Sequence, residues 1–128
     1  MKNAFLTLLA ALAAFLLAPH LAQAHHGWAE FELNREITLE GAVTDFHFTN
    51  PHCVVEFDVK NGKGQAEKWQ GEFSSPGALA RKGWTAASLQ TGDKITITGN
   101  PAKNNVPAMH ITRVRLANGQ EFQIEGGR

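Results

Sequence analysis

The segment SSPGALARKG, residues 74–83, decides the fold because it interrupts an otherwise regular alternation of apolar and polar residues. Ser75 followed by Pro76 predicts the start of a helix, since proline suits the first helical turn. Gly83 predicts where that helix stops. On both sides of the segment most apolar positions recur with period two, which indicates half-buried strands. The sequence therefore predicts one short helix within a chain of strands.

Three strands are predicted before this helix. They are EITLEGAVTDF (36–46), HCVVEFDV (52–59) and EKWQGEF (67–73), and the glycine-rich stretch NGKG (61–64) turns the chain between the last two. The residues expected to face inward are Ile37, Leu39, Val43, Cys53, Val55, Phe57, Val59, Trp69 and Phe73. Gly41 lies inside the first strand, where glycine usually marks a bend or bulge. A strand that serves two edges of a small barrel needs such a bend.

Further strands are predicted after the helix. They are KITITG (94–99), with Ile95 and Ile97 inward, MHITRVRL (109–116) and EFQI (121–124), the last two joined by a hairpin turn at Asn118-Gly119. In MHITRVRL the apolar residues change parity partway along the strand. Met109 and Ile111 share one face, whereas Val114 and Leu116 share the other. This change predicts a β-bulge near Thr112 or Arg113.

The order of these elements predicts the fold class. Three strands, one short helix and two or three more strands are typical of an OB-type barrel. We therefore expect an all-β protein with one short helix, a small OB-like antiparallel β-barrel, as a single domain over residues 25–128. A plain antiparallel sandwich is the alternative. The positions of Gly41 and of the helix favour the barrel.

Residues 1–24 have the features of a secretory signal peptide. Lys2 supplies a positive charge, the 15-residue run Ala4–Ala18 is mainly apolar, and Ala22-Gln23-Ala24 fits the small-residue cleavage rule. A membrane anchor is the alternative, but an anchor usually needs about 20 apolar residues. We therefore expect a periplasmic or secreted protein whose mature chain begins at His25.

The charge balance argues against a polyanionic partner. The chain has 12 Lys and Arg against 12 Asp and Glu, and no basic patch stands out. Neither nucleic acid nor an anionic membrane surface is therefore expected as the main partner. Cys53 is the single cysteine, so no disulfide can form within the chain. Because no nucleophile motif, phosphate-binding glycine loop or Cys-x-x-Cys pair is present, we expect no catalytic residues and no enzymatic activity.

An ordered set of motifs resembles a known family of small secreted bacterial proteins. The motifs are AHHGWAEF (24–31), TNPH (49–52), SPGALARKGW (75–84), TGDKITITGNPA (91–102) and LANGQEF (116–122). On these motifs the chain resembles domain-of-unknown-function family 6152. Family members more often have His-His-Ser-Phe where this chain has His-His-Gly-Trp at 25–28. The resemblance implies one exported domain, and it assigns no activity and no site residue.

Five histidines are candidate metal ligands, namely His25, His26, His47, His52 and His110. Cleavage after Ala24 would free the amine of His25 beside its own imidazole, and His26 adds a second imidazole. Amine and neutral imidazole nitrogens suit Cu(II), Ni(II) and Zn(II), and copper is the most favoured. A complete site needs a further ligand from the fold, and a turn at Asn50-Pro51 could bring His47 and His52 together. The alternative is a solvated tail, with the other three histidines on the surface.

Three functions are compatible with the sequence. The first is a non-catalytic exported module that binds a transition metal, with copper favoured. The second is a periplasmic interaction domain that binds a ligand or a protein through the barrel face and exposed aromatics such as Trp28 and Trp84. The third, a copper oxidoreductase, is least favoured, because removing 24 of 128 residues leaves a 104-residue barrel with little substrate surface. Cys53 shares the inward parity, so a buried thiol is expected rather than a soft Cu(I) ligand.

Overall fold

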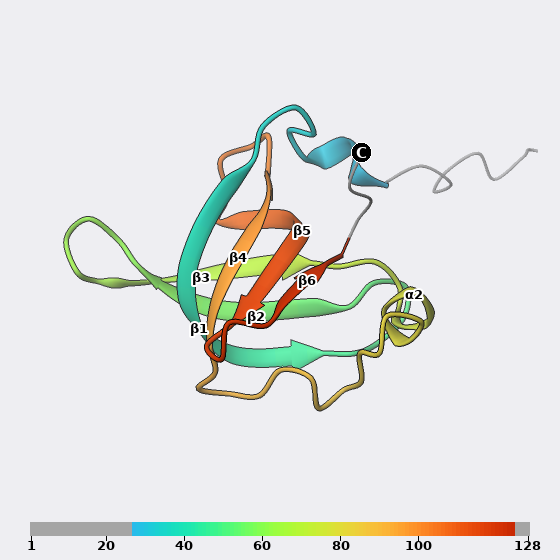
Figure 1. The fold of residues 1–128 in the computed structure, drawn as a ribbon. Helices are drawn as coiled ribbons and strands as arrows, with labels where there is room; N and C mark the ends of the chain where they lie inside the picture. The colour runs from blue at the N-terminus through green and yellow to red at the C-terminus, as the bar shows by residue number, and fades with distance from the viewer. Residues whose placement is uncertain (1–26, 125–128) are drawn as a thin grey trace, which may run out of the picture.

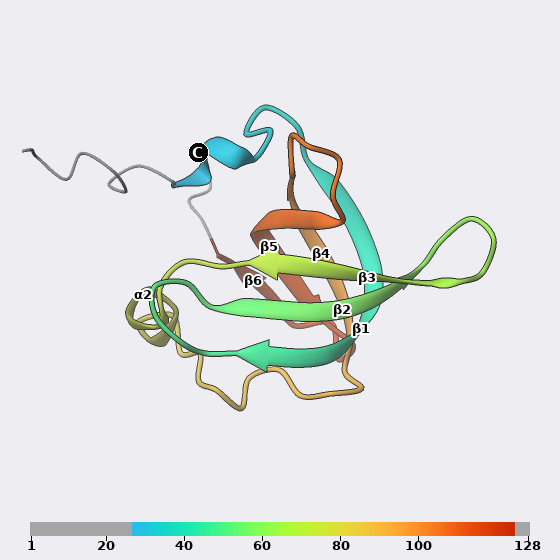
Figure 2. The same cartoon turned by 180° about the vertical axis from the view of Figure 1, so that it is seen from behind.

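Six strands form the framework of the chain that the structure describes. The computed structural model describes residues 27–124 (Figures 1 and 2). Its strands are β1 (Ile37–His47), β2 (Val54–Lys60), β3 (Ala66–Glu72), β4 (Lys94–Pro101), β5 (Ala108–Leu116) and β6 (Glu121–Gln123). A 3-10 helix, η1 (Trp28–Glu30), precedes them, and a short α-helix, α2 (Pro76–Ala80), separates β3 from β4.

The six strands form one sheet in the order β3-β2-β1-β4-β5-β6, and a parallel pairing of β3 with β5 closes it into a barrel. Gln70–Glu72 pairs with Ala108–His110 at this closure. The long strand β1 pairs with β4 along its first half and with β2 along its second half. The prediction of a small OB-like β-barrel, with its helix between the third and fourth strands, is confirmed.

Gly41 lies where β1 serves both neighbouring strands. It pairs with Val59 of β2 and with Ile95 of β4. A Cβ atom at this position would lie 2.7 Å from the carbonyl oxygen of Asp58 and 2.9 Å from the Phe57 ring. These separations are too short for any residue other than glycine. β1 curves strongly between its two partners (Figure 2), so the predicted role of Gly41 as the bend of a shared strand is confirmed.

The α2 helix begins at the predicted residue. Ser75 is its N-cap, and the Ser75 Oγ accepts a hydrogen bond from the Ala78 amide at 3.3 Å. Gly83, with φ of +86°, turns the chain after the helix has ended. The helix lies beside one end of the barrel in both ribbon views, and its Leu79 is fully buried (Figures 1 and 2). The helix therefore covers one end of the core.

The core confirms the predicted strand faces. Val43, Cys53, Val55, Phe57, Phe73, Ile95 and Ile97 are buried, and Ile37, Leu39, Val59 and Trp69 are half-buried against them. The segment between β3 and β4 adds Leu79, Trp84 and Leu89 to the same cluster. Trp84 is only 3% exposed, so it is a core residue rather than a surface aromatic available to a ligand.

Two β-bulges change the parity of the strands. Between β4 and β5, Thr98 pairs with Arg113 and Gly99 pairs with Ile111, which leaves Thr112 as the extra residue of β5. The predicted bulge is confirmed, and it explains why Met109, Ile111 and Val114 are all buried. A second bulge in β1, between Val43 and Asp45, was not predicted from the sequence.

The predicted signal peptide, residues 1–24, lies outside the described residues, as do His25 and His26. The longer of the two described helices, α2, has five residues. Within residues 27–124, no helix has the length and apolarity that crossing a membrane requires.

Candidate functional site

The indole of Trp28 stacks on two imidazoles. Its ring centroid lies 3.6 Å from that of His110, with an interplanar angle of 25°, and 5.0 Å from that of His52, with an angle of 26°. These three side chains come from η1, from β5 and from the loop that leads into β2. With Glu72 of β3, they form what we call the seam cluster, because it lies where β3 meets β5.

Strand alternation places both imidazoles on the outer side of the barrel. The residues next to them in sequence, Cys53 and Met109, are fully buried in the core. His52 and His110 have the opposite parity, so their side chains leave the core on the outer surface. Register then brings them together, because Glu72 pairs with Val54 of β2 on one side and with His110 of β5 on the other.

The short helix η1 is fastened over this seam by backbone contacts. Phe31, the residue after η1, forms an isolated bridge with Ala102. The Glu32 amide donates to the carbonyl oxygen of Pro101 at 2.9 Å, and the Phe31 ring lies 5.9 Å from the His110 ring. His110 is consequently only 2% exposed. The backbone contacts of Phe31 and Glu32 therefore hold Trp28 on the seam, in addition to the stacking of its own ring.

The imidazole of His52 is hydrogen-bonded to Glu72 and remains accessible to solvent. Its Nδ1 lies 2.5 Å from Oε1 of Glu72, and the two side chains are 35% and 30% exposed. A carboxylate can only accept a hydrogen bond, so Nδ1 carries the proton and donates it. The lone pair of the neutral ring is then on Nε2, which is the atom able to bind a metal ion.

His47 belongs to a different part of the surface. Its Nε2 lies 3.4 Å from an Asp45 oxygen and 3.7 Å from a Glu56 oxygen, and Glu56 also lies 3.4 Å from the ammonium group of Lys68. The seam cluster thus contains two of the three histidines that the sequence offered as ligands from the fold, His52 and His110, and does not contain His47.

The described part of the chain does not form a metal site by itself. Within residues 27–124, no group of three or more His, Cys, Asp or Glu side chains is arranged to hold an ion. The sulfur of Cys53 is enclosed in the core, and burial raises the pKa of its thiol, while a backbone hydrogen bond with Thr49 offsets part of the effect. The predicted ligands His25 and His26 lie outside the described residues.

Sequence reasoning missed two members of the seam cluster. Trp28 was considered only as an exposed aromatic, although its position two residues after His26 was a usable signal. Glu72 gave no local signal, because its partner His52 is 20 residues away and the two meet only through the pairing of β2 with β3.

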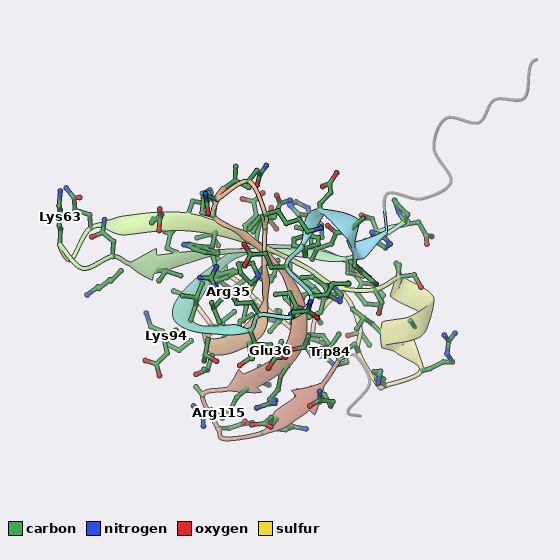
Figure 3. The ribbon with its side chains drawn as sticks, turned by 90° about the horizontal axis from the view of Figure 1, so that it is seen from above. Arg35, Glu36, Lys63, Trp84, Lys94 and Arg115 are labelled. Carbon is green, nitrogen blue, oxygen red and sulfur yellow. The ribbon has the colours of Figure 1, made fainter. Side chains whose placement is uncertain are left out.

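A second surface feature is an open groove of about 740 Å³ where β1 passes from β4 to β2. Its apolar lining includes Leu39, Val59, Ile95 and Leu116, and its charged lining residues are Glu40, Asp58, Lys60, Lys94 and Arg115. Figure 3 labels Lys94 and Arg115, which come from β4 and β5. The lining contains no histidine or cysteine, and its charges have both signs. Its composition therefore selects neither a metal ion nor an anion.

The closed sheet defines a small OB-type barrel. Comparison with family models then gives the family. The chain belongs to the family of unknown function DUF6152, whose model matches residues 14–109. The expected family is thus confirmed. No curated protein matches the chain.

Solved structures with a similar fold are distant in sequence. The mitochondrial single-stranded DNA-binding protein Rim1 from S. cerevisiae matches with a TM-score of 0.50 and 8% identity, over 65% of this chain and 93% of Rim1. A ZRD-deleted mutant of TiaS in complex with agmatine matches with a TM-score of 0.51 and 20% identity, over 73% of this chain and 27% of TiaS. At these identities the similarity shows the fold alone.

Proposed function

We propose that the mature chain is an exported, non-catalytic module that binds one transition-metal ion, with Cu(II) preferred. The ligands are the amine and imidazole of His25, the imidazole of His26 and Nε2 of His52. The single observation that carries the proposal is the stacking of Trp28 on His52 and His110. This contact fastens the start of the described chain to the two imidazoles of the seam.

Covalent connectivity limits how far the α-carbons of the two terminal histidines can lie from that of Trp28. Two residues of fully extended chain span at most about 7 Å, and three span about 10–11 Å. The α-carbons of His26 and His25 are therefore within these distances of the Trp28 α-carbon. Because the Trp28 ring is stacked at 5.0 Å on the His52 ring, imidazoles on so short a tether can meet His52 at a common ion.

His52 is favoured over His110 by its exposure and over His47 by its position in the seam cluster. His110 is 2% exposed and lies directly beneath the Trp28 ring, so a metal ion could reach it only if that ring moved. His47 pairs with carboxylates outside the seam cluster. His52 has an accessible side chain and an Nε2 atom that Glu72 does not use.

The donor atoms favour Cu(II). Once Met1 is removed with the signal peptide, the only sulfur atoms that remain in the sequence are those of Cys53 and Met109. Both residues are fully buried, so neither offers a soft ligand to an ion at the seam. A site built from amine and imidazole nitrogens binds divalent ions of the first row with copper strongest.

The alternative of an aromatic binding surface has less support. Trp28 and Trp69 are half-buried and Trp84 is buried. The exposed large apolar side chains among residues 27–124 are Leu33 and Val106, which are not aromatic.

Nucleic acid is also disfavoured as a partner. In OB-folds that bind oligonucleotides, the ligand lies against strands 2 and 3. Here the outward positions of β2 and β3 carry three acids, Glu56, Asp58 and Glu72, against two lysines, Lys60 and Lys68, so this face lacks the excess of positive charge that phosphates require. We accordingly propose a metal ion, in the periplasm or outside the cell, as what the module binds.

Calorimetric titration of copper into the cleaved protein tests the proposal. The expected result is one Cu(II) per chain, with binding that weakens as pH falls through about 6.5, where free imidazole takes up a proton. A variant with one extra methionine before His25 displaces the terminal amine and should bind at least tenfold more weakly. A His26→Ala variant should also bind more weakly. Unchanged affinity in both variants would reject the proposal and leave the two histidines as a solvated tail.

A further inference from the structure

We infer that Glu72 is the positioning residue of this site, and that it holds His52 with Nε2 available to the metal ion. The inference rests on the proposed function, because it assigns a role at the same site. Its basis is the hydrogen bond of 2.5 Å between His52 Nδ1 and Glu72 Oε1 at the point where three strands meet.

The backbone around Glu72 fixes its position. It pairs across the sheet with Val54 in an antiparallel register and with His110 in a parallel register. The preceding residue, Gly71, is packed so closely that a Cβ atom there would lie 2.5 Å from a methyl carbon of Ile111. A carboxylate on this strand therefore has little freedom to shift along the seam.

Two contacts together determine the orientation of the His52 ring. Glu72 accepts the Nδ1 proton, which selects the tautomer, and Trp28 stacks on the ring face at 26°, which restricts rotation of its plane. The remaining nitrogen, Nε2, points away from Glu72 because it lies on the opposite side of the ring. The seam thus provides a pre-oriented nitrogen ligand before any ion arrives.

The chemical effect of this arrangement is known from metal sites in general. A carboxylate that accepts the other ring proton of a ligating histidine orients the ring and raises its basicity, and its removal typically weakens metal binding 10–100-fold. The negative charge of a carboxylate on the ligating ring stabilises the divalent ion more than Cu(I), so Glu72 should also lower the reduction potential of bound copper.

The chain supplies a matched control in Glu56. It is also an outward carboxylate beside a histidine, with 34% exposure against 30% for Glu72. Its oxygen lies 3.7 Å from Nε2 of His47, which is outside the seam cluster. Glu56→Gln therefore removes one negative charge from the same face without touching the His52 ring.

The experiment compares Glu72→Gln with Glu56→Gln in the cleaved protein, using Cu(II) titration against a competing chelator. Glu72→Gln should lose 10–100-fold in affinity, and Glu56→Gln should stay within threefold of wild type. In a His52→Ala background, Glu72→Gln should have no further effect, because Glu72 acts through His52. Thermal unfolding of the metal-free variants shows whether each has folded.

Spectroscopy and redox titration separate positioning from a merely structural role. Pulsed EPR of the copper-bound protein detects the remote nitrogen of a ligating imidazole, and Glu72→Gln should change that signal while leaving the number of ligating nitrogens unchanged. The copper reduction potential should rise by 59 mV for each tenfold selective loss of Cu(II) affinity.

Three outcomes would overturn the inference. They are equal affinity in wild type and Glu72→Gln, an equal loss in Glu56→Gln, or a loss in Glu72→Gln that persists without His52. If wild type binds no copper, the proposed function fails as well. If wild type binds through His52 but is insensitive to Glu72, the inference about Glu72 alone fails.

Discussion

Replacement of Gly99 by alanine should destabilise the barrel strongly. Gly99 of β4 lies opposite the Thr112 bulge, where the parity of β5 changes. A Cβ atom at position 99 would lie 2.2 Å from the carbonyl oxygen of His110 and 3.0 Å from its carbonyl carbon. Both are backbone atoms, so no side-chain rotation can relieve the contact, and the strands must separate.

The magnitude follows from general experience with overpacked cores. Inserting a methyl group into a packed interior costs about 1–3 kcal/mol when side chains can adjust. Since backbone must move here, we expect a loss of about 3 kcal/mol or more in the free energy of unfolding. For a domain of about 100 residues, this lowers Tm by about 12 °C or more.

Urea denaturation followed by tryptophan fluorescence gives the comparison, and Gly62→Ala serves as the control. Position 62 is in the loop between β2 and β3, and a Cβ atom there would have no neighbour within 4 Å. Gly62→Ala should therefore be neutral or stabilising by up to about 1 kcal/mol. If Gly99→Ala retained stability within about 0.5 kcal/mol of Gly62→Ala, the register at the bulge would be wrong.

Three further predictions follow from the fold and from the chain start. Phe57→Ala should lower the free energy of unfolding by about 3–5 kcal/mol, because Phe57 is fully buried, and a near-unchanged urea midpoint would contradict the strand parity. Burial raises the pKa of Cys53 above its ordinary value of 9.0, so the unfolded chain loses the thiol proton at a lower pH than the folded chain does. The free energy of unfolding should therefore fall as pH rises above about 9. Cys53→Ala should remove that decline, and an equal decline in both proteins, measured by urea denaturation at pH 8 to 10.5, would count against a buried thiol. Mass spectrometry of the exported protein should give a chain starting at His25, and a start at Met1 would exclude the terminal-amine ligand.

The parts of the fold that the sequence predicted are those governed by local chemistry. Alternation of apolar residues identified the strands, and Ser75 with Pro76 marked the helix start because a cap and a proline act within one turn. The parity change in β5 located the bulge at Thr112 because burial demands that apolar residues face the core. The bulge in β1 was missed although it leaves a similar trace, because Val43 and Phe46 differ in parity and both pack against the core. One apolar residue near the end of the predicted strand was too short a pattern to locate it.

The seam cluster shows where sequence reasoning stopped. His47 and His52 were equal candidates from the sequence, and the contacts with Trp28 and Glu72 distinguish His52 in the structure. Glu72 meets His52 through strand pairing between residues 20 apart, which no spacing rule reveals. The closure of β3 onto β5 joins residues still further apart, such as Glu72 and His110, and long-range pairing of this kind depends on the packing of the whole barrel.

The central claim is that the terminal histidines and His52 bind the same ion, and a double-mutant cycle tests it most directly. The cycle combines an extra methionine before His25 with His52→Ala, and copper affinity is measured by titration in the cleaved protein, with His47→Ala as the control. We expect one Cu(II) per chain, a loss of at least tenfold (about 1.4 kcal/mol) for each single change, and a loss in the double variant that differs clearly from the sum of the two. His47→Ala should bind as wild type does. Strictly additive losses, or two independent copper ions per chain, would contradict a site shared by the tail and the fold.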